Sequence, residues 1–331
     1  MSGAGRGGPG SEAPGEAEDP AGEEPSGGGY PVEVGDRFFV LLNPRAASGG
    51  DVSALRRRVA AQFAGHGVPF DLHEAPDPAS ALSAARSAAR AGCRAVAAVG
   101  GDGTVARALR GTAGTEVPVA IIPFGTGNQL AANFGIPTSL EGSVRVAVEG
   151  EIEPIDLGRV DGEYFALIAG AGLDAEMVAD ATDSMKERLG FAAYLLSGLK
   201  HVVTPKSADF RIVADGKEIE VRASMVLLAN VGLLAAGSLP VEVQVGPKVS
   251  FRDGLVDVCI YAPRTLPDMA RMLWQVARQE YAGNDKMLFL QAREVRVEAD
   301  PPVAAQIDGE PAGETPFEVE MLPLAGRILV P

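Results

Sequence analysis

The sequence predicts an α/β domain with a parallel sheet, followed by an antiparallel β domain. Three observations support this fold class. From residue 37 to about 150, apolar runs alternate with helical runs rich in Ala and Arg, which is typical of parallel strands joined by crossover helices. After residue 150 the apolar runs are shorter and alternate with polar residues, as in antiparallel strands. Asp161-Gly162 and Asp215-Gly216 stand between such runs, and this dipeptide favours hairpin turns.

The first half contains four apolar segments that are expected to be strands and three segments that are expected to be helices. The strand segments are RFFVLLNP (37–44), VPFDL (68–72), CRAVAAVG (93–100) and VPVAIIPFG (117–125). The helical segments are DVSALRRRVAAQFAGHG (51–67), PASALSAARSAARAG (78–92) and TVARALRG (104–111), with glycine at or just beyond several ends. A sheet of this kind binds ligands in the loops at the carboxyl ends of its strands.

The domain boundaries follow from changes in composition. Residues 1–34 are rich in Gly, Pro and Glu and lack an apolar segment, so we expect a disordered acidic tail rather than a targeting peptide. The α/β domain then spans 35–150. Residues 151–331 are expected to form a β-sandwich or open barrel, interrupted by helical stretches near 176–201 and 266–279, with the last residues returning to the first domain.

Composition argues against several classes of function. The chain has 331 residues, 46% hydrophobic residues and a net charge of −15, and this charge disfavours binding to nucleic-acid phosphates. Cys93 and Cys259 lie far apart and the three histidines are scattered, so neither a disulfide framework nor a zinc site is expected. The longest apolar stretch, 224–237, is too short to cross a membrane as a helix.

Three loops rich in small residues follow predicted strands, in the segments LLNPRAASGG, VGGDGT and PFGTGNQLA. Small residues allow backbone N–H groups to approach an anion, and a following helix N-terminus favours negative charge. Asp102 lies between glycines. A carboxylate beside a bound phosphate would be repelled by it, so its presence indicates either a cation that bridges the two or a proton transfer in the reaction. The loops match neither GxxxxGK[ST] nor GxGxxG with a downstream acid. The candidate binding residues are Asn43, Ser48, Gly100, Gly101, Asp102, Gly103, Thr104, Gly125, Thr126 and Asn128.

In their order and spacing, NPRAASGG, GGDGT and PFGTGNQLA resemble the catalytic domain of the diacylglycerol kinase family, whose superfamily includes bacterial soluble lipid kinases, sphingosine kinases and ceramide kinases. The resemblance continues through IDLGRVDGEYFALIAGAGLDAEMV, KERLGFAAYLLSGLK, FRDGLVDVCIY and IDGEP, and so covers about 37–330. It implies a Rossmann-like, phosphofructokinase-like nucleotide domain and a β-sandwich that binds the lipid. The implied activity is transfer of the γ-phosphate of ATP to a hydroxyl of a lipid alcohol such as diacylglycerol, with Mg²⁺.

The resemblance also implies roles for individual residues. Gly100 to Thr104 fall on the family's nucleotide loop and Thr126 on a second nucleotide contact, with Asp102 acting on the nucleotide or its metal. Asp308 falls on the proton acceptor, with Glu310 two residues later; a carboxylate in that role activates an alcohol. Without the resemblance, Asp308-Gly309 would favour an ordinary β-turn. Asp253 falls on a structural Mg²⁺ site, to which Ser250 and Leu255 would contribute backbone carbonyls.

The segment MKERLGFAAYLLSGLKHVV (185–203) has two interpretations. It lines the lipid entrance or touches a membrane surface, or it packs as an ordinary helix on the β domain. We expect a cytoplasmic protein with peripheral membrane contact, and a homodimer is a further expectation.

The chain departs from the family pattern at three places. Ala106-Arg107 replaces the usual Asn-Glu after GGDGT, Gln129 replaces an Asp, and the second strand lacks a threonine near Leu72. Arg107 is therefore either a substitute phosphate contact or a solvated helix residue. Two alternative functions remain beside the lipid kinase: a non-catalytic nucleotide- or lipid-binding protein, and an NAD kinase, whose fold also uses a GGDG loop.

Overall fold

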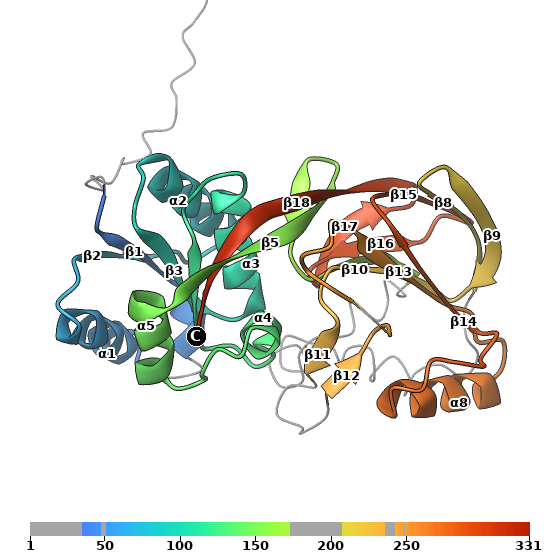
Figure 1. Cartoon of the computed structure of the whole chain (residues 1–331), viewed down its shortest axis with the longest axis horizontal. Coiled ribbons are helices and arrows are strands. Elements are labelled where there is room, and N and C mark those ends of the chain that lie inside the picture. Colours follow the sequence, from blue (N-terminus) through green and yellow to red (C-terminus); the bar gives the residue numbers. More distant parts are fainter. Residues whose placement is uncertain (1–34, 48–50, 173–206, 236–241, 248) are drawn as a thin grey trace, which may run out of the picture. The chain divides into compact units, whose positions relative to one another are not determined.

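A computed structural model describes residues 35–47, 51–172, 207–235, 242–247 and 249–331 (Figure 1). The predicted acidic tail, the candidate residue Ser48 and the predicted helix near 176–201 lie outside the described residues. The predicted helix near 266–279 is confirmed as α8, Leu266–Ala277. Within the described ranges, no helix combines the length and the apolar character needed to cross a membrane.

The first half of the chain contains parallel strands in the order β2-β1-β3-β4. Phe38 is level with Phe70 of β2 on one side and with Ala95 of β3 on the other. The inner strands are completely buried, as expected for parallel strands covered on both faces. Their bounds are β1 Phe38–Leu42, β2 Phe70–Glu74, β3 Ala95–Gly100 and β4 Val119–Pro123.

Helices cover both faces of these strands. Leu41 and Ala98 pack in the same core as α2 and α3, whereas Val40 and Val99 pack in the core that contains α1 and α5. Because successive strand residues point to opposite faces, this division gives the predicted doubly wound layer. The bounds are η1 Pro44–Ala47, α1 Val52–Gly65, α2 Pro78–Arg90, α3 Asp102–Thr112, α4 Gln129–Asn133 and α5 Leu140–Glu149. The sequence analysis did not predict α4 or α5.

The second half forms two sheets. The parallel strands continue through β18 into β15, β8 and β9, and β5 and β6 join this sheet beside β18. The other sheet has the order β14-β13-β10-β7-β16-β17, and β11 pairs with β12 separately. The bounds are β5 Glu151–Val160, β6 Glu163–Phe165, β7 Ile168–Ala171, β8 Ala208–Ala214, β9 Lys217–Ala223, β10 Met225–Ala229, β11 Leu233–Ala235, β12 Glu242–Gln244, β13 Val256–Tyr261, β14 Met287–Ala292, β15 Glu294–Asp300, β16 Ala304–Ile307, β17 Glu310–Glu314 and β18 Phe317–Val330.

The antiparallel strands enclose a common core. Alternate residues such as Ile212 of β8 and Val297 of β15 are buried with Leu228 of β10 and Val258 of β13, which belong to the other sheet. This two-sheet core confirms the predicted β-sandwich and rules out the open barrel.

The long strand β18 belongs to both halves of the chain. Near its start Val319 pairs with Val295 of β15, and near its end Ile328 pairs with Val119 of β4. β5 runs antiparallel to β18 over most of the same length (Figure 1). The parallel sheet and the sandwich are therefore joined by backbone pairing along β18, with one irregularity between Leu322 and Gly326.

Three hairpins are closed by Asp-Gly turns in which both residues have positive φ. The φ values are 48° and 87° at Asp161-Gly162 and 47° and 78° at Asp215-Gly216, which confirms both predicted turns. The third turn, Asp308-Gly309, has φ values of 49° and 82° and joins β16 to β17. A candidate catalytic residue therefore occupies a tight turn.

Candidate functional site

The carboxyl ends of β1, β3 and β4 bring the glycine-rich loops to one edge of the sheet. The backbone N–H of Asn43 donates to Val99 O at 3.0 Å, and that of Phe124 donates to Gly100 O at 2.9 Å. The side-chain amide of Asn43 then donates to the Thr104 hydroxyl at 3.1 Å. The residues that sequence reasoning selected around Asn43, Gly100 and Thr104 are therefore neighbours.

Several loop glycines have a packing role that the sequence did not reveal. A Cβ atom added to Gly125 would lie 2.4 Å from the Cα of Gly101, so the second and third loops meet backbone against backbone. One added to Gly127 would lie 2.8 Å from Oδ2 of Asp102. These glycines are required by the close approach of the two loops, independently of any phosphate.

Asp102 is the first residue of α3, whereas the sequence predicted that this helix begins at Thr104. Its Oδ1 atom accepts the backbone N–H of Leu130 at 3.2 Å, at the start of α4. Burial raises the pKa of Asp102 to about 6; the backbone N–H groups of Leu130 and Gln129 oppose this shift, and the charge of Asp308 adds to it. Asp102 thus connects the second loop, the third loop and the second half of the chain.

Asn128 and Thr126 differ in their surroundings. Asn128 has a φ of 45°, its Oδ1 accepts the Gly125 N–H at 2.9 Å, and its Nδ2 donates to Gly125 O at 2.7 Å. Its amide therefore holds the third loop in shape. Thr126 lies exposed at the tip of the same loop.

A cavity of about 100 Å³ lies among the β1–η1 loop, the β2–α2 loop and α3. It is smaller than the ~300–1,000 Å³ typical of pockets for whole small molecules, so it would hold only part of a nucleotide. Two guanidinium groups, an amide and a hydroxyl line it and can donate to phosphate oxygens; the Asp77 carboxylate, which accepts the Ser80 N–H as the N-cap of α2, lines it as well. The lining residues are Asn43, Arg45, Ala75, Pro76, Asp77, Pro78, Ala81, Thr104 and Arg107.

Asp308 is almost completely enclosed, with 2% of its side chain exposed. Oδ1 accepts the backbone N–H groups of Leu167 at 2.9 Å and Ile168 at 3.1 Å, and Oδ2 accepts that of Ala166 at 3.1 Å. Burial raises the pKa of Asp308, while these N–H groups and Arg110 act in the opposite direction. The turn therefore presents a fixed carboxylate whose proton affinity is above the usual range.

Two arginines of α3 face the Asp308 turn. Arg107 forms an ion pair and a hydrogen bond with Glu310, the first residue of β17. Arg110 Nη2 lies 3.8 Å from Asp308 Oδ2, and its Nη1 lies 3.8 Å from Glu163 Oε2. Sequence reasoning missed Arg110; its spacing of three residues from Arg107, which places the two on one helix face, was the available signal.

The predicted Mg²⁺ residues lie in the turn before β13. Asp253 Oδ1 accepts the Leu255 N–H at 3.1 Å, Ser250 Oγ accepts the Arg252 N–H at 3.2 Å, and Gln291 Nε2 donates to Asp253 Oδ2 at 3.1 Å. Gln291 also reaches Asp257 Oδ2 at 3.4 Å, and burial together with the nearby Asp253 raises the pKa of Asp257 to about 6.

This donor set is compatible in kind with Mg²⁺, because the carboxylates of Asp253 and Asp257 supply only oxygen and repel each other. The described part of the chain contains no cluster of three or more His, Cys, Asp or Glu side chains suited to a metal. The remaining ligands would be backbone carbonyls and water.

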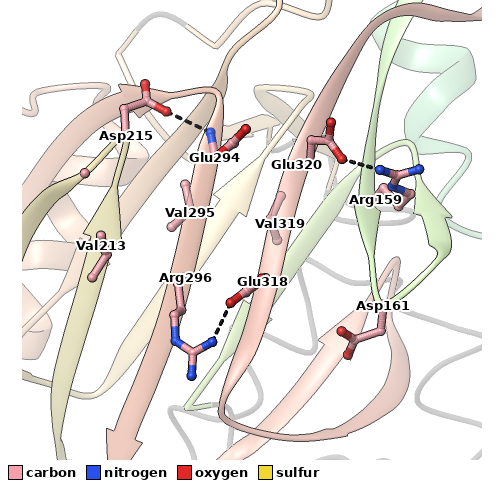
Figure 2. Close-up of a pocket in the computed structure, with 11 residues that line it drawn as sticks. Arg159, Asp161, Val213, Asp215, Glu294, Val295, Arg296, Glu318, Val319 and Glu320 are labelled. Carbon is pink, nitrogen blue, oxygen red and sulfur yellow. Dashed lines mark hydrogen bonds and ion pairs between the residues drawn. The ribbon is translucent and has the colours of Figure 1, made fainter.

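A larger groove of about 500 Å³ shares no residue with these clusters. Figure 2 shows its charged side chains interacting within the groove: Arg296 with Glu318, Arg159 with Glu320, and Asp215 with the backbone N–H of Glu294 at 2.9 Å. Because both arginines of the groove are neutralised by glutamates on the sheet surface, the groove offers no reactive constellation.

Comparison with known proteins places this geometry in a family. Residues 37–160 match the family model described as diacylglycerol kinase catalytic domain, and residues 168–330 match the YegS C-terminal NAD kinase beta sandwich-like domain. A diacylglycerol kinase of Mycobacterium tuberculosis is 30% identical over 307 residues, covering 90% of this chain and 96% of that protein. The chain belongs to the diacylglycerol kinase family.

Other relatives agree with this membership. A diacylglycerol kinase of Bacillus subtilis is 29% identical over 288 residues, covering 85% of this chain and 92% of that protein. An uncharacterized protein of Synechocystis is 31% identical over 240 residues, covering 71% of this chain and about half, 54%, of its own length. A solved structure of a putative diacylglycerol kinase from Bacillus anthracis shares the fold, with a TM-score of 0.76 at 21% identity, and covers 89% of this chain and 97% of that one.

Proposed function

We propose that this member of the diacylglycerol kinase family is an ATP-dependent lipid kinase that phosphorylates a hydroxyl of a diacylglycerol-like lipid. The observation that carries the proposal is the buried Asp308 turn, whose charge acts on Asp102 beside the glycine-rich loops. A carboxylate with raised proton affinity thus lies near a site suited to phosphate. The names of the relatives from M. tuberculosis and B. subtilis support the substrate class.

Asp308 is proposed to accept the proton of the attacking hydroxyl. The hydroxyl oxygen forms a bond to the γ-phosphorus, the bond from that phosphorus to the bridging oxygen breaks, and ADP leaves with the electron pair. Oδ2 of Asp308 accepts one backbone N–H, so a lone pair remains for the proton. The backbone N–H groups of Leu167 and Ile168 hold the carboxylate in place during the transfer.

We assign Asp102, with Gly100 to Thr104, to the nucleotide and its metal. Mg²⁺ bound there would neutralise phosphate charge. Asp253, with the backbone carbonyls of Ser250 and Leu255, is proposed as a separate structural Mg²⁺ site. Thr126 and Asn128 would border the nucleotide, Thr126 from the exposed tip of the loop and Asn128 through the loop that it shapes.

The test is transfer of labelled γ-phosphate from ATP to a panel of lipid alcohols, with each product identified by mass. We expect the wild-type protein to phosphorylate a diacylglycerol-like lipid and Asp308→Asn or Asp102→Asn to lose at least about 10²-fold in rate. Asp215→Asn, at an exposed Asp-Gly turn outside the site, is the matched control and should keep wild-type activity. Unchanged activity in both site variants would refute the assignment.

The same assay separates the two alternative functions. Because the second domain is described as NAD kinase-like, NAD is included as an acceptor, and its phosphorylation would replace the lipid proposal. Binding of ATP without transfer to any acceptor would favour a non-catalytic protein. Ala106, Arg107 and Gln129, where the chain departs from the family pattern, are the residues that this outcome would implicate.

A further inference from the structure

Arg107 lies between the small cavity and the Asp308 turn. It lines the cavity together with Asn43 and Thr104, and it also forms the ion pair with Glu310. Only 14% of its side chain is exposed, against 44% for Glu310. The solvated-arginine interpretation of Arg107 is therefore wrong: the guanidinium is enclosed at the boundary between two functional clusters.

Gly103 creates the space that this guanidinium occupies. A Cβ atom added to Gly103 would lie 2.9 Å from Nη1 of Arg107, four residues later on the same helix. The arginine thus folds back over the first turn of α3, where the glycine-rich loop ends. A flexible side chain at this place is directed toward the helix N-terminus, where anions are favoured.

The charges around Arg107 would allow it to exchange the Glu310 carboxylate for a phosphate. Burial and the neighbouring Arg110 lower the pKa of Arg107, and Glu310 opposes this shift, so the pairing with a carboxylate stabilises a partly desolvated cation. Among the described residues, the Nε atom of Arg110 has no hydrogen-bond acceptor. The enclosed guanidinium groups of Arg107 and Arg110 thus depend partly on the half-exposed carboxylate of Glu310 for neutralisation. An incoming phosphate oxygen could displace this carboxylate.

We propose that Arg107 binds the phosphate groups of the nucleotide in the 100 Å³ cavity and exchanges its ion pair with Glu310 for this contact. The proposal rests on the proposed function for the identity of the nucleotide. Phosphate binding then leaves Glu310 with Arg110, whose Nη1 lies 4.0 Å from its Oε2, so that filling the cavity removes one positive charge from the carboxylates beside Asp308. Arg107 supplies positive charge where the family pattern has a glutamate.

Binding measurements test this contact separately from catalysis. ATP, ADP and AMP are titrated calorimetrically, with and without Mg²⁺, into the full-length wild-type protein, Arg107→Gln and Arg107→Lys. We expect Arg107→Gln to weaken ATP binding by about 10- to 100-fold and AMP binding much less, because charged hydrogen bonds to the outer phosphates are lost. Arg107→Lys should recover part of the loss, since a lysine keeps the charge without the fork.

Glu310→Gln and Arg90→Gln complete the test. If Glu310 competes with phosphate for Arg107, Glu310→Gln should bind ATP as tightly as the wild type or up to about tenfold more tightly. Arg90, exposed at the end of α2, is the charge-matched control and should not alter binding. Equal ATP affinity in the wild type and Arg107→Gln would overturn the inference, as would absence of nucleotide binding. ATP binding that depends on Arg107, without lipid phosphorylation, would overturn only the proposed function.

A second and independent observation concerns the outer face of α8. Trp274, the one tryptophan of the sequence, is 64% exposed at the centre of this face, while Met272 and Val276 on the opposite face are buried. Arg271 and Arg278 are exposed three residues before and four residues after it. The Arg278 guanidinium lies 5.5 Å from the Trp274 ring centroid and also pairs with the exposed Glu280 at 2.9 Å, a contact that anionic headgroups would have to replace. The acid of this helix, Asp268, forms the capping box with Thr265 at its start.

We propose that this face, formed by Leu266, Arg271, Trp274 and Arg278, docks on an anionic phospholipid surface. Tryptophan favours the boundary between water and lipid, and arginines beside it complement anionic headgroups. The basic face contrasts with the chain's net charge of −15, so it would orient the protein on such a surface. The role of this contact, which would bring the protein to its lipid substrate, rests on the proposed lipid-kinase function. The exposed face itself does not depend on that function.

The emission of Trp274 reports directly on this contact. The probe is a vesicle of phosphatidylcholine with 30% phosphatidylglycerol, compared with phosphatidylcholine alone. We expect anionic vesicles to shift the emission to shorter wavelength and to protect it from acrylamide. Arg271→Gln and Arg278→Gln should each weaken binding by about fivefold.

Trp274→Ala should weaken sedimentation with vesicles more than Ile152→Ala, which removes a 53% exposed residue of β5. Vesicle binding with unchanged emission, or no binding, would overturn the proposal; lipid phosphorylation in detergent is scored separately.

Discussion

The two buried aspartates of the candidate site reach similar electrostatic states by different routes. Asp102 stands at the first turn of a helix, among glycines adjacent in the sequence, and the backbone N–H groups of Leu130 and Gln129 in the neighbouring loop stabilise its carboxylate. Asp308 stands at a hairpin turn and accepts three N–H groups from residues about 140 positions earlier in the chain. The pKa of each is raised chiefly by burial.

The difference shows which part of the fold sets the surroundings of each carboxylate. The surroundings of Asp102 depend on the close approach of two short loops, and those of Asp308 depend on the complete assembly of the sandwich. Changes at Asp308 should therefore affect folding and chemistry together, whereas changes at Asp102 should separate them.

The largest effect is expected for Asp308→Asn. Asparagine tolerates positive φ, but its single oxygen cannot accept all three backbone N–H groups, and its amide faces a donor. We expect the free energy of unfolding to fall by about 2–4 kcal/mol. Asp215→Asn is the matched control, since that carboxylate also accepts N–H groups, of Arg293 and Glu294, but is exposed. Urea denaturation of both variants measures the difference, and equal losses would contradict it.

The next effect concerns pH and Asp102. The pKa of Asp102 is about 6 in the folded state against 3.8 ordinarily, so the folded state binds more protons between these values. Its contribution to stability is present below pH 4 and is lost as pH rises through 6, by about 2–3 kcal/mol. The difference in unfolding free energy between the wild type and Asp102→Asn should therefore change by this amount between pH 4 and pH 7. A constant difference would show that Asp102 is not desolvated.

Gly125→Ala should destabilise by about 1–3 kcal/mol, because the new Cβ would lie 2.4 Å from the Cα of Gly101 and the loop backbones must separate. Gly103→Ala, in the same site, is the comparison: its Cβ meets the end of the flexible Arg107 side chain, and alanine favours the helix. We expect that variant to stay within about 1 kcal/mol of the wild type while binding ATP more weakly. Thermal denaturation and ATP titration measure the two effects, and the reverse order of stability would refute the packing argument.

The smallest effect is expected at the acidic residues Asp253 and Asp257. If Mg²⁺ binds there, a free concentration of about ten times its dissociation constant should stabilise the folded protein by about 1.4 kcal/mol. Asp253→Asn should abolish this response, while the wild type should keep it in the absence of nucleotide. Melting temperature against Mg²⁺ concentration measures it; an equal response in both proteins would place the cation elsewhere.

Local sequence patterns were sufficient for most elements of the fold. The buried strand FFVLL and the glycine-rich loops after β3 and β4 lie where predicted, because buried parallel strands are continuously apolar and their loops gather at one edge. The short helix α4 was not predicted because it has five residues and begins at a left-handed Asn128. The start of α3 was placed two residues late because Gly103 disfavours helix unless something occupies its open side, as Arg107 does.

By itself the sequence determined the doubly wound half, the antiparallel half and the turns at Asp161 and Asp215, since apolar periodicity and Asp-Gly chemistry act over a few residues. Only the tertiary structure decided that Asp308 caps three backbone N–H groups and that Arg107 pairs with Glu310 across 203 positions. These contacts connect segments far apart in the chain, and their partners are set by how the sheets assemble rather than by any local preference.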